Sequence, residues 1–155
     1  MKPVFILLYG LPGSGKTTLA KCFATYADFQ FIDMTGIKKN FQNHIEKNLK
    51  SVNTITEGVY SKPERRNKIL EMASETHEVI CVYIHEDYPV LASRRDMKNI
   101  PRYSELYREM IVEVDNVNKF AILSKSLKDR ISDLDSLINL YQSNKEIKHS
   151  ILGTL

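Results

Sequence analysis

The stretch that decides the fold of this chain lies near its start and reads Gly10-Leu11-Pro12-Gly13-Ser14-Gly15-Lys16-Thr17-Thr18. A continuous apolar run at 4–9 precedes it, and an amphipathic stretch at 16–26 follows it. A buried strand, a glycine-rich turn ending in Lys-Thr, and a helix are together the parts of a phosphate-binding loop, or P-loop. A chance glycine-rich turn would not supply all of these parts in this order, so the sequence predicts a nucleotide-binding site here.

The residue types of this loop match the chemistry of a bound triphosphate. Its glycines let successive backbone N–H groups turn toward phosphate oxygens, and the following helix adds its positive N-terminal end. Lys16 is predicted to bridge the β- and γ-phosphates as a catalytic residue, and the Thr17 hydroxyl to bind Mg²⁺. The predicted cofactors are ATP and Mg²⁺, and the predicted nucleotide-binding residues are Gly10, Pro12, Gly13, Ser14, Gly15, Lys16, Thr17 and Thr18.

Beyond the loop, apolar β-type runs alternate with helical stretches, which is typical of βα units and a parallel sheet. We expect strands at 4–9, 29–32, 52–56, 79–84 and 119–123, and helices at 16–26, 36–49, 63–76, 101–112 and 128–141. The length of 155 residues suits one compact domain over 1–155. The prediction is therefore an α/β fold of the P-loop NTPase type, with three α/β/α layers and a mainly parallel five-stranded sheet.

The composition excludes several classes of protein. The formal net charge of +3 allows an anionic ligand but does not by itself indicate a nucleic-acid-binding protein. No apolar run approaches the roughly 20 residues of a membrane span, and the first run leads into glycines rather than a signal cleavage site. Two cysteines and four scattered histidines give neither a disulfide framework nor metal-ligand spacing. We therefore expect a cytoplasmic protein with no membrane partner.

Two acids close predicted strands, where ligands bind in parallel sheets. Asp33 ends the second strand and can act as a catalytic base on an acceptor hydroxyl; the alternative is a helix N-cap. Glu57 ends the third strand and can hold the acceptor or a magnesium-bound water; the alternative is an ordinary loop acid. Both acids are predicted to lie on the ligand side of the sheet.

Basic residues gather in two later segments. Ser93-Arg94-Arg95-Asp96-Met97-Lys98 begins a predicted lid at 93–102. Arg94 and Arg95 can close over the triphosphate there and act in catalysis; the alternative is a solvated charge run. Arg65 and Arg66 lie at the start of a predicted helix, where a cation opposes the helix dipole. Their position indicates an anionic partner; the alternative is that both are surface residues.

Three segments together resemble the kinase domain of polynucleotide 5′-hydroxyl kinases, which belong to a wider group of zeta-toxin-like and AAA-type P-loop kinases. They are the P-loop, Thr56-Glu57-Gly58-Val59-Tyr60-Ser61-Lys62-Pro63-Glu64-Arg65-Arg66, and Ser93-Arg94-Arg95 with Pro101 and its helix. The resemblance covers most of 4–112, and only the P-loop is a specific motif. It implies an acceptor site at Glu57, Lys38, Arg65 and Arg66, with Arg94 or Arg95 on the ATP phosphates.

One position departs from that family. The family keeps its catalytic Asp just after the second strand, with an Arg shortly beyond it. An ungapped match puts Thr35 at the Asp position and Lys38 at the Arg position. Asp33 takes the place of the family's base only after a small shift of the alignment.

Three functions remain open at this stage. The first is ATP-dependent transfer of the γ-phosphoryl group to a nucleic-acid hydroxyl, such as a 5′ end. The second is a kinase for a small metabolite, a nucleoside or a nucleoside monophosphate, and the third is a non-catalytic nucleotide-binding regulatory module. A polynucleotide would need an open basic groove around Lys38, Lys39, Arg65 and Arg66, whereas a closed pocket would favour a metabolite.

The C-terminal helix and tail, 128–155, carry an apolar stripe. Ile131, Leu134, Ile138 and Tyr141 recur at helical spacing. We expect this stripe to dock on the sheet; the alternative is a helix through which the chain forms a homo-oligomer.

Overall fold

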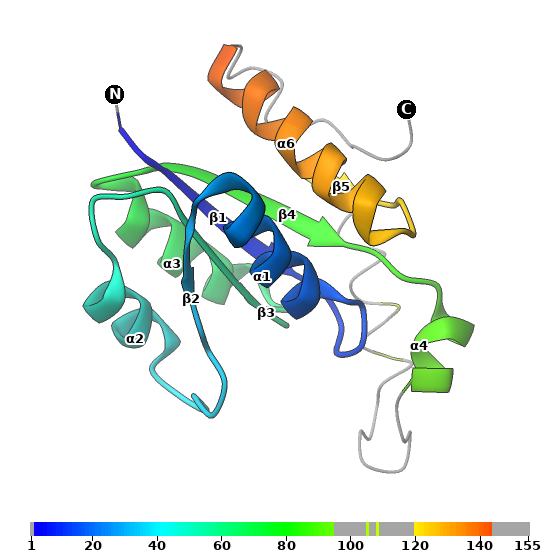
Figure 1. The fold of residues 1–155 in the computed structure, drawn as a ribbon. Helices are drawn as coiled ribbons and strands as arrows, with labels where there is room; N and C mark the ends of the chain where they lie inside the picture. Colours follow the sequence, from blue (N-terminus) through cyan, green and yellow to red (C-terminus); the bar gives the residue numbers. More distant parts are fainter. Residues whose placement is uncertain (1, 95–104, 106–107, 109–119, 144–155) are drawn as a thin grey trace.

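The sheet has five strands in the order β2-β3-β1-β4-β5, and every neighbouring pair is parallel. The computed structural model describes residues 2–94, 105, 108 and 120–143 (Figure 1). The strands are β1 (Val4–Tyr9), β2 (Gln30–Ile32), β3 (Thr54–Gly58), β4 (Glu78–Ile84) and β5 (Phe120–Ile122). The predicted α/β fold of the P-loop NTPase type is confirmed, and the sheet is wholly rather than mainly parallel.

Helices cover both faces of the sheet and give the three predicted layers (Figure 1). They are α1 (Lys16–Ala27), α2 (Phe41–Asn48), α3 (Pro63–Ser74), α4 (Tyr88–Arg94) and α6 (Leu127–Ser143). On one face, Phe23 of α1 and Leu134 of α6 belong to the same buried cluster as Ile6. On the other face, Ile45 of α2 and Ile69 of α3 pack in a second cluster around β1.

β1 is the central strand and supports the candidate site. All its residues are buried, because β3 and β4 flank it and helices cover both faces. This burial explains its continuous apolar sequence. Ile6 and Leu8 point into the core beneath α1 and α6, whereas Phe5 and Leu7 point into the other core. A strand held on all sides gives the loop that follows it a rigid base.

Two predicted boundaries are wrong in an informative way. The helix expected at 36–49 begins only at Phe41, because Gly36 (φ +81°) and Asn40 (φ +56°) adopt left-handed conformations that interrupt a right-handed helix. The third strand occupies Thr54–Gly58 rather than 52–56. Glu57 therefore lies inside β3, paired in register with Leu8 of β1, and the sheet itself fixes its backbone.

The apolar stripe of α6 packs within the chain. Leu134, Ile138 and Tyr141 are buried in the core beside α1, and Ile131 packs partly against it. The predicted docking on the sheet is confirmed, and the buried stripe cannot also serve as an oligomer surface. The lid beyond Arg94 and the tail after 143 lie outside the described residues, as does the helix expected at 101–112 apart from residues 105 and 108. Within the described part of the chain, no helix combines the length and apolarity of a membrane span.

Candidate active site

The P-loop joins the carboxyl end of β1 to the first turn of α1. Gly13 (φ +89°) and Gly15 (φ +90°) both adopt left-handed conformations, which residues with a Cβ rarely take. Gly10 is needed for a different reason: a Cβ at this position would lie 2.7 Å from the carbonyl oxygen of Ile84. The glycines therefore let the loop turn tightly against β4, with the N-terminus of α1 at its end.

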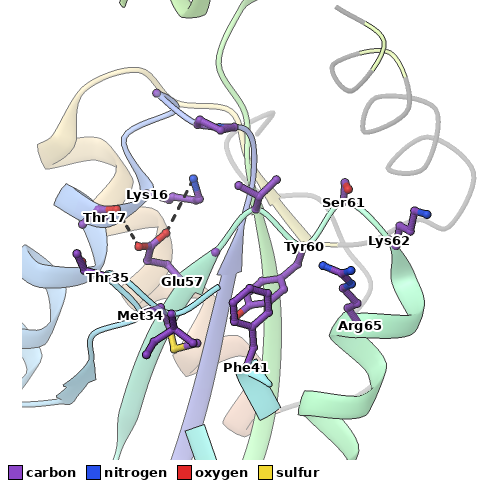
Figure 2. A pocket seen from close by; sticks show the side chains of 15 residues that line it. Lys16, Thr17, Met34, Thr35, Phe41, Glu57, Tyr60, Ser61, Lys62 and Arg65 are labelled. Carbon is purple, nitrogen blue, oxygen red and sulfur yellow. Dashed lines mark hydrogen bonds and ion pairs between the residues drawn. The ribbon is translucent and has the colours of Figure 1, made fainter. Parts of the chain in front are cut away.

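Lys16, Thr17 and Glu57 come together at the carboxyl ends of β1 and β3 (Figure 2). The Thr17 hydroxyl donates to Oε1 of Glu57 at 2.8 Å, and Nζ of Lys16 lies 3.9 Å from Oε2 of the same carboxylate. Lys16 also donates to the carbonyl oxygen of Leu11 at 3.2 Å. The Lys16 side chain is only 6% exposed, because it folds back along the loop.

A pocket of about 570 Å³ opens beside this group. Its lining has a polar end formed by the P-loop and Glu57, an apolar wall, and a basic rim (Figure 2). It is lined by Pro12, Gly13, Lys16, Thr17, Met34, Thr35, Ile37, Phe41, Glu57, Gly58, Val59, Tyr60, Ser61, Lys62 and Arg65. Among these residues Glu57 is the only carboxylate. The volume is in the usual range for a small-molecule site.

An aromatic pair forms much of the apolar wall. The rings of Phe41 and Tyr60 meet edge to face, with centroids 5.9 Å apart. Tyr60 adopts a positive φ of 39°, uncommon for a bulky residue, and Gly58 makes room for it because a Cβ at Gly58 would overlap the Tyr60 ring. Burial raises the pKa of the Tyr60 hydroxyl, which stays neutral at physiological pH. The wall therefore presents uncharged aromatic surface to the pocket, mainly from Phe41, because Tyr60 is only 6% exposed.

A groove of about 320 Å³ adjoins the pocket and shares Phe41 and Arg65 with it. It is lined by Lys38, Lys39, Asn40, Phe41, Gln42, Asn43, Arg65, Lys68 and Ile69. The cations come from the segment before α2 and from α3. Among the described residues that line the groove, four carry a cationic side chain and none is an acid, so the groove suits an anionic ligand that extends out of the pocket.

Asp33 does not line the pocket. Its carboxylate accepts a hydrogen bond from the Thr35 N–H at 2.8 Å, and this turn leads the chain away from β2. The hydrogen bonds with Thr35 lower the pKa of the Asp33 carboxyl, which makes it a weaker base. Thr35 lines the pocket, whereas Asp33 borders a separate hollow beside Lys21 of α1. The sequence predicted that Asp33 and Glu57 both lie on the ligand side of the sheet. The structure instead leaves Asp33 outside the pocket that the P-loop and Glu57 line.

Arg66 is also placed differently from the expectation. It is 1% exposed, its guanidinium lies 4.1 Å from the ring centroid of Tyr9, and it donates to the carbonyl oxygen of Tyr60. Arg66 shares the buried face of α3 with Ile69 and Ala73, whereas Arg65 faces the pocket rim. Arg66 therefore supports the backbone behind the aromatic wall and does not present its charge to an acceptor.

Arg94 ends α4 beside the P-loop. Its Nη1 donates to the carbonyl oxygen of Gly13 at 2.9 Å and lies 3.5 Å from Oε2 of Glu86. Its side chain is half exposed. The predicted proximity of Arg94 to the phosphate site is thus present, while Arg95 lies outside the described residues.

Comparison with known families decides where the chain belongs. The model of the ATPase family associated with various cellular activities (AAA) matches residues 6–145. The chain belongs to this family. No curated protein matches the sequence of this AAA-family chain significantly. The predicted resemblance to polynucleotide kinases remains a prediction.

Solved structures share the fold of this AAA-family chain at low sequence identity. A gluconokinase from Sinorhizobium meliloti 1021 is 20% identical with a TM-score of 0.62, over 92% of this chain and 98% of that one. Shikimate kinase from Acinetobacter baumannii in complex with shikimate is 17% identical with a TM-score of 0.56, over 94% and 96%. Deoxyadenosine kinase from M. mycoides is 11% identical with a TM-score of 0.56, over 87% and 98%.

Sequence reasoning missed a group of charges behind the P-loop of this AAA-family chain. Glu86 follows β4 and lies within 3.5 Å of Arg94, Lys125 and Arg130. Two signals were available. Glu86 follows a buried strand just as Asp33 follows β2, and Arg130 is a cation near the start of a helix, where it opposes the dipole.

Proposed function

We propose that this chain is an ATP- and Mg²⁺-dependent kinase that transfers the γ-phosphoryl group to a hydroxyl acceptor bound in the pocket. The observation that carries the proposal is the meeting of Lys16, Thr17 and Glu57 at the polar end of one pocket of about 570 Å³. The P-loop alone would indicate nucleotide binding. A cavity that extends from the same lysine to an aromatic wall leaves room for an acceptor beside the phosphates, as a two-substrate phosphotransferase needs.

The residues at the P-loop end fit a magnesium nucleotide. The Thr17 hydroxyl is a hard oxygen donor of the kind that Mg²⁺ prefers, and Oε1 of Glu57, 2.8 Å away, would accept a hydrogen bond from a magnesium-bound water. Bound there, Mg²⁺ would neutralise phosphate charge. Lys16 would leave Leu11 and Glu57 for the β- and γ-phosphates, and the loop amides would hold the remaining oxygens. Arg94 and Arg95 are proposed to add positive charge at the transferring group.

Glu57 is our candidate for the general base in place of Asp33. Among the described residues that line the pocket it is the only acid, and β3 fixes its backbone. A base must reach the acceptor hydroxyl from beside the P-loop, and Glu57 occupies that position whereas Asp33 does not. The carboxylate would take the proton of the acceptor hydroxyl while the hydroxyl oxygen bonds to the γ-phosphorus. The bond from the γ-phosphorus to the β–γ bridging oxygen would break in the same step, and ADP would leave.

We further propose that the acceptor hydroxyl belongs to a nucleic-acid end. The groove that continues from the pocket supports this choice, because Lys38, Arg65 and Lys68 line it and would accompany a phosphodiester backbone. The Phe41–Tyr60 wall would receive a base by edge or face contact. Arg66, once expected to take part, is buried and has no place in this site.

A small acceptor is the second candidate. The pocket volume of about 570 Å³ holds a nucleoside or a sugar-sized metabolite without use of the groove. The solved structures that share the fold include a gluconokinase, a shikimate kinase and a deoxyadenosine kinase. For such an acceptor the basic groove would contribute little to binding.

The test is an acceptor screen with ATP labelled at the γ-phosphate. The full chain is incubated with Mg²⁺, 5′-hydroxyl oligonucleotides, matched 5′-phosphorylated oligonucleotides, nucleosides and small polyols, and Lys16→Ala serves as the inactive control. Label on the 5′-hydroxyl oligonucleotides alone would support the leading proposal. Label on a nucleoside or polyol would replace the acceptor, and ATP binding with no transfer and no ADP would leave a non-catalytic module.

A further inference from the structure

Arg130 connects the P-loop to the sheet from behind, outside the pocket. It lies near the start of α6 and is only 4% exposed. Its guanidinium donates to the main-chain carbonyls of Ser14 (Nη1, 2.6 Å), Ser124 (Nε, 2.8 Å) and His85 (Nη2, 2.9 Å). These carbonyls belong to the P-loop and to the segments that follow β5 and β4. One side chain therefore fixes the loop relative to two strand ends.

The contact with Ser14 sets the direction of one peptide group. In a planar trans peptide, the Ser14 oxygen and the Gly15 N–H point in opposite directions. An arginine that holds this oxygen on the outside of the loop therefore turns the Gly15 N–H to the inside, where phosphate binds. The cationic donor also polarises the peptide and strengthens its N–H as a donor. Gly15 permits this approach, since a Cβ there would lie 2.8 Å from Nη1 of Arg130.

Glu86 in turn holds the arginine. It is 4% exposed, and its Oε2 lies 3.5 Å from both Nη2 of Arg130 and Nη1 of Arg94. Because Arg94 donates to Gly13, two successive P-loop carbonyls each accept from an arginine that pairs with the same carboxylate. Burial lowers the pKa of Arg130, and the charge of Glu86 opposes that shift and favours the cation.

We propose that Arg130, held by Glu86, is a positioning residue that presets the P-loop amides for polyphosphate binding. It acts through the Ser14–Gly15 peptide and does not face the pocket. Loss of Arg130 would free this peptide to rotate, and each wrongly turned N–H would withdraw a donor from the phosphate site. The affinity for polyphosphate should then fall, whereas the affinity for the acceptor, which binds at the Phe41–Tyr60 end, should not.

Calorimetry on the full chain with inorganic tripolyphosphate and with Mg·ADP tests the proposal. We expect Arg130→Met to raise both dissociation constants about 10- to 100-fold, the range for loss of a charge-assisted hydrogen bond. Arg130→Lys should give an intermediate value, because an ammonium group reaches fewer carbonyls than the planar fork of arginine. The matched control is Arg66→Met, which removes an equally buried arginine on the opposite face of the sheet and should leave both constants unchanged.

Each outcome decides the question. Unchanged tripolyphosphate binding in both Arg130 variants overturns the proposal, and so does an equal loss in Arg66→Met, which would indicate general destabilisation. If Arg130→Met fails to fold, Arg130→Lys and Glu86→Gln carry the test, and wild-type affinity in both overturns it. The proposal does not depend on the acceptor: binding of tripolyphosphate without phosphoryl transfer would contradict the proposed kinase but not the role of Arg130.

Discussion

The two ends of the pocket differ in their chemical groups: main-chain groups form one end, and side chains form the other. The phosphate end is mainly main chain, formed by the uninterrupted loop at 10–17. Arg130 holds the Ser14 carbonyl from behind, and Arg94 donates to the Gly13 carbonyl. The acceptor end is side chain, assembled from the segment after β2, the start of α2, and the segment between β3 and α3. Backbone geometry at one end serves any triphosphate, whereas the identities of the side chains at the other end decide which acceptor fits.

The largest effect should come from Lys16, the cationic side chain that the phosphate end places inside the pocket. We expect Lys16→Ala to reduce turnover by about 10³-fold, since it removes a preorganised cation from the charge that develops during transfer. The measurement is initial-rate ADP release, with circular dichroism to confirm the fold. Lys21→Ala, an exposed lysine of the same helix, is the control and should keep wild-type turnover. A Lys16→Ala protein of normal activity would contradict the assignment of the whole phosphate end.

The boundary between the two ends is tested by Glu57→Gln. The amide keeps the size of the side chain and an oxygen that can accept from Thr17, but it cannot take a proton. We expect turnover to fall about 10²-fold with little change in the KM for ATP, the lower range for loss of a general base.

Asp33→Asn is the matched substitution for the competing base. The amide oxygen can still accept from the Thr35 N–H, so the turn should persist and turnover should stay at the wild-type level. The reverse result, with Asp33→Asn inactive and Glu57→Gln active, would return the catalytic role to Asp33.

The phosphate end was predictable from sequence because its parts are contiguous. The run 4–18 contains the strand, the turn and the helix start, and no distant residue is needed to interpret them. The parallel sheet was predictable for the same reason, since each βα unit carries its own periodicity. The loop sequence could not reveal which residues support it, because Glu86 follows β4 and Arg130 lies in α6, 116 positions from Ser14.

The acceptor end was predicted less well because single-residue orientation decides it. Asp33 and Thr35 are two positions apart, yet a side-chain turn directs only Thr35 to the pocket. Adjacent residues of a helix point about 100° apart, so Arg65 and Arg66 cannot both face the acceptor. The spacing of Arg66, Ile69 and Ala73 marks the buried face of α3, and this periodicity was available in the sequence. Arginine is usually exposed, so the residue type of Arg66 argued against its burial and led to the wrong expectation.

A smaller effect should distinguish a nucleic-acid acceptor from a metabolite at the acceptor end. We expect Arg65→Ala and Lys38→Ala each to weaken binding of a 5′-hydroxyl oligonucleotide and to reduce the slope of log affinity against log salt by about 1. Lys47→Ala, an exposed lysine of α2 outside the groove lining, is the control. Fluorescence anisotropy at several salt concentrations measures the slope. Slopes unchanged in both groove variants would favour a small acceptor that does not occupy the groove.

The smallest effect concerns the outer edge of the charged support behind the phosphate end. Hydrogen bonds from Lys125 and His85 lower the pKa of the Asp87 carboxyl, and Lys125 approaches it to 2.8 Å. A depressed pKa in the folded state means that the contribution to stability is complete above the unfolded pKa of about 3.9 and is lost as pH falls through the folded value.

Asp87→Asn should therefore lower Tm slightly near pH 7, and the difference from wild type should close below about pH 4. Because Asp87 and Lys125 are both more than half exposed, the loss at neutral pH should be less than about 1 kcal/mol. Asp87→Asn in a Lys125→Met background isolates the contribution of the Asp87–Lys125 ion pair. Most of the Tm difference caused by Asp87→Asn should vanish in that background. A Tm difference that persists unchanged to pH 3 would show that the Asp87 charge is not what stabilises this edge. The charged support of the P-loop would then owe nothing to the Asp87 charge and would rest on Glu86, Arg94 and Arg130.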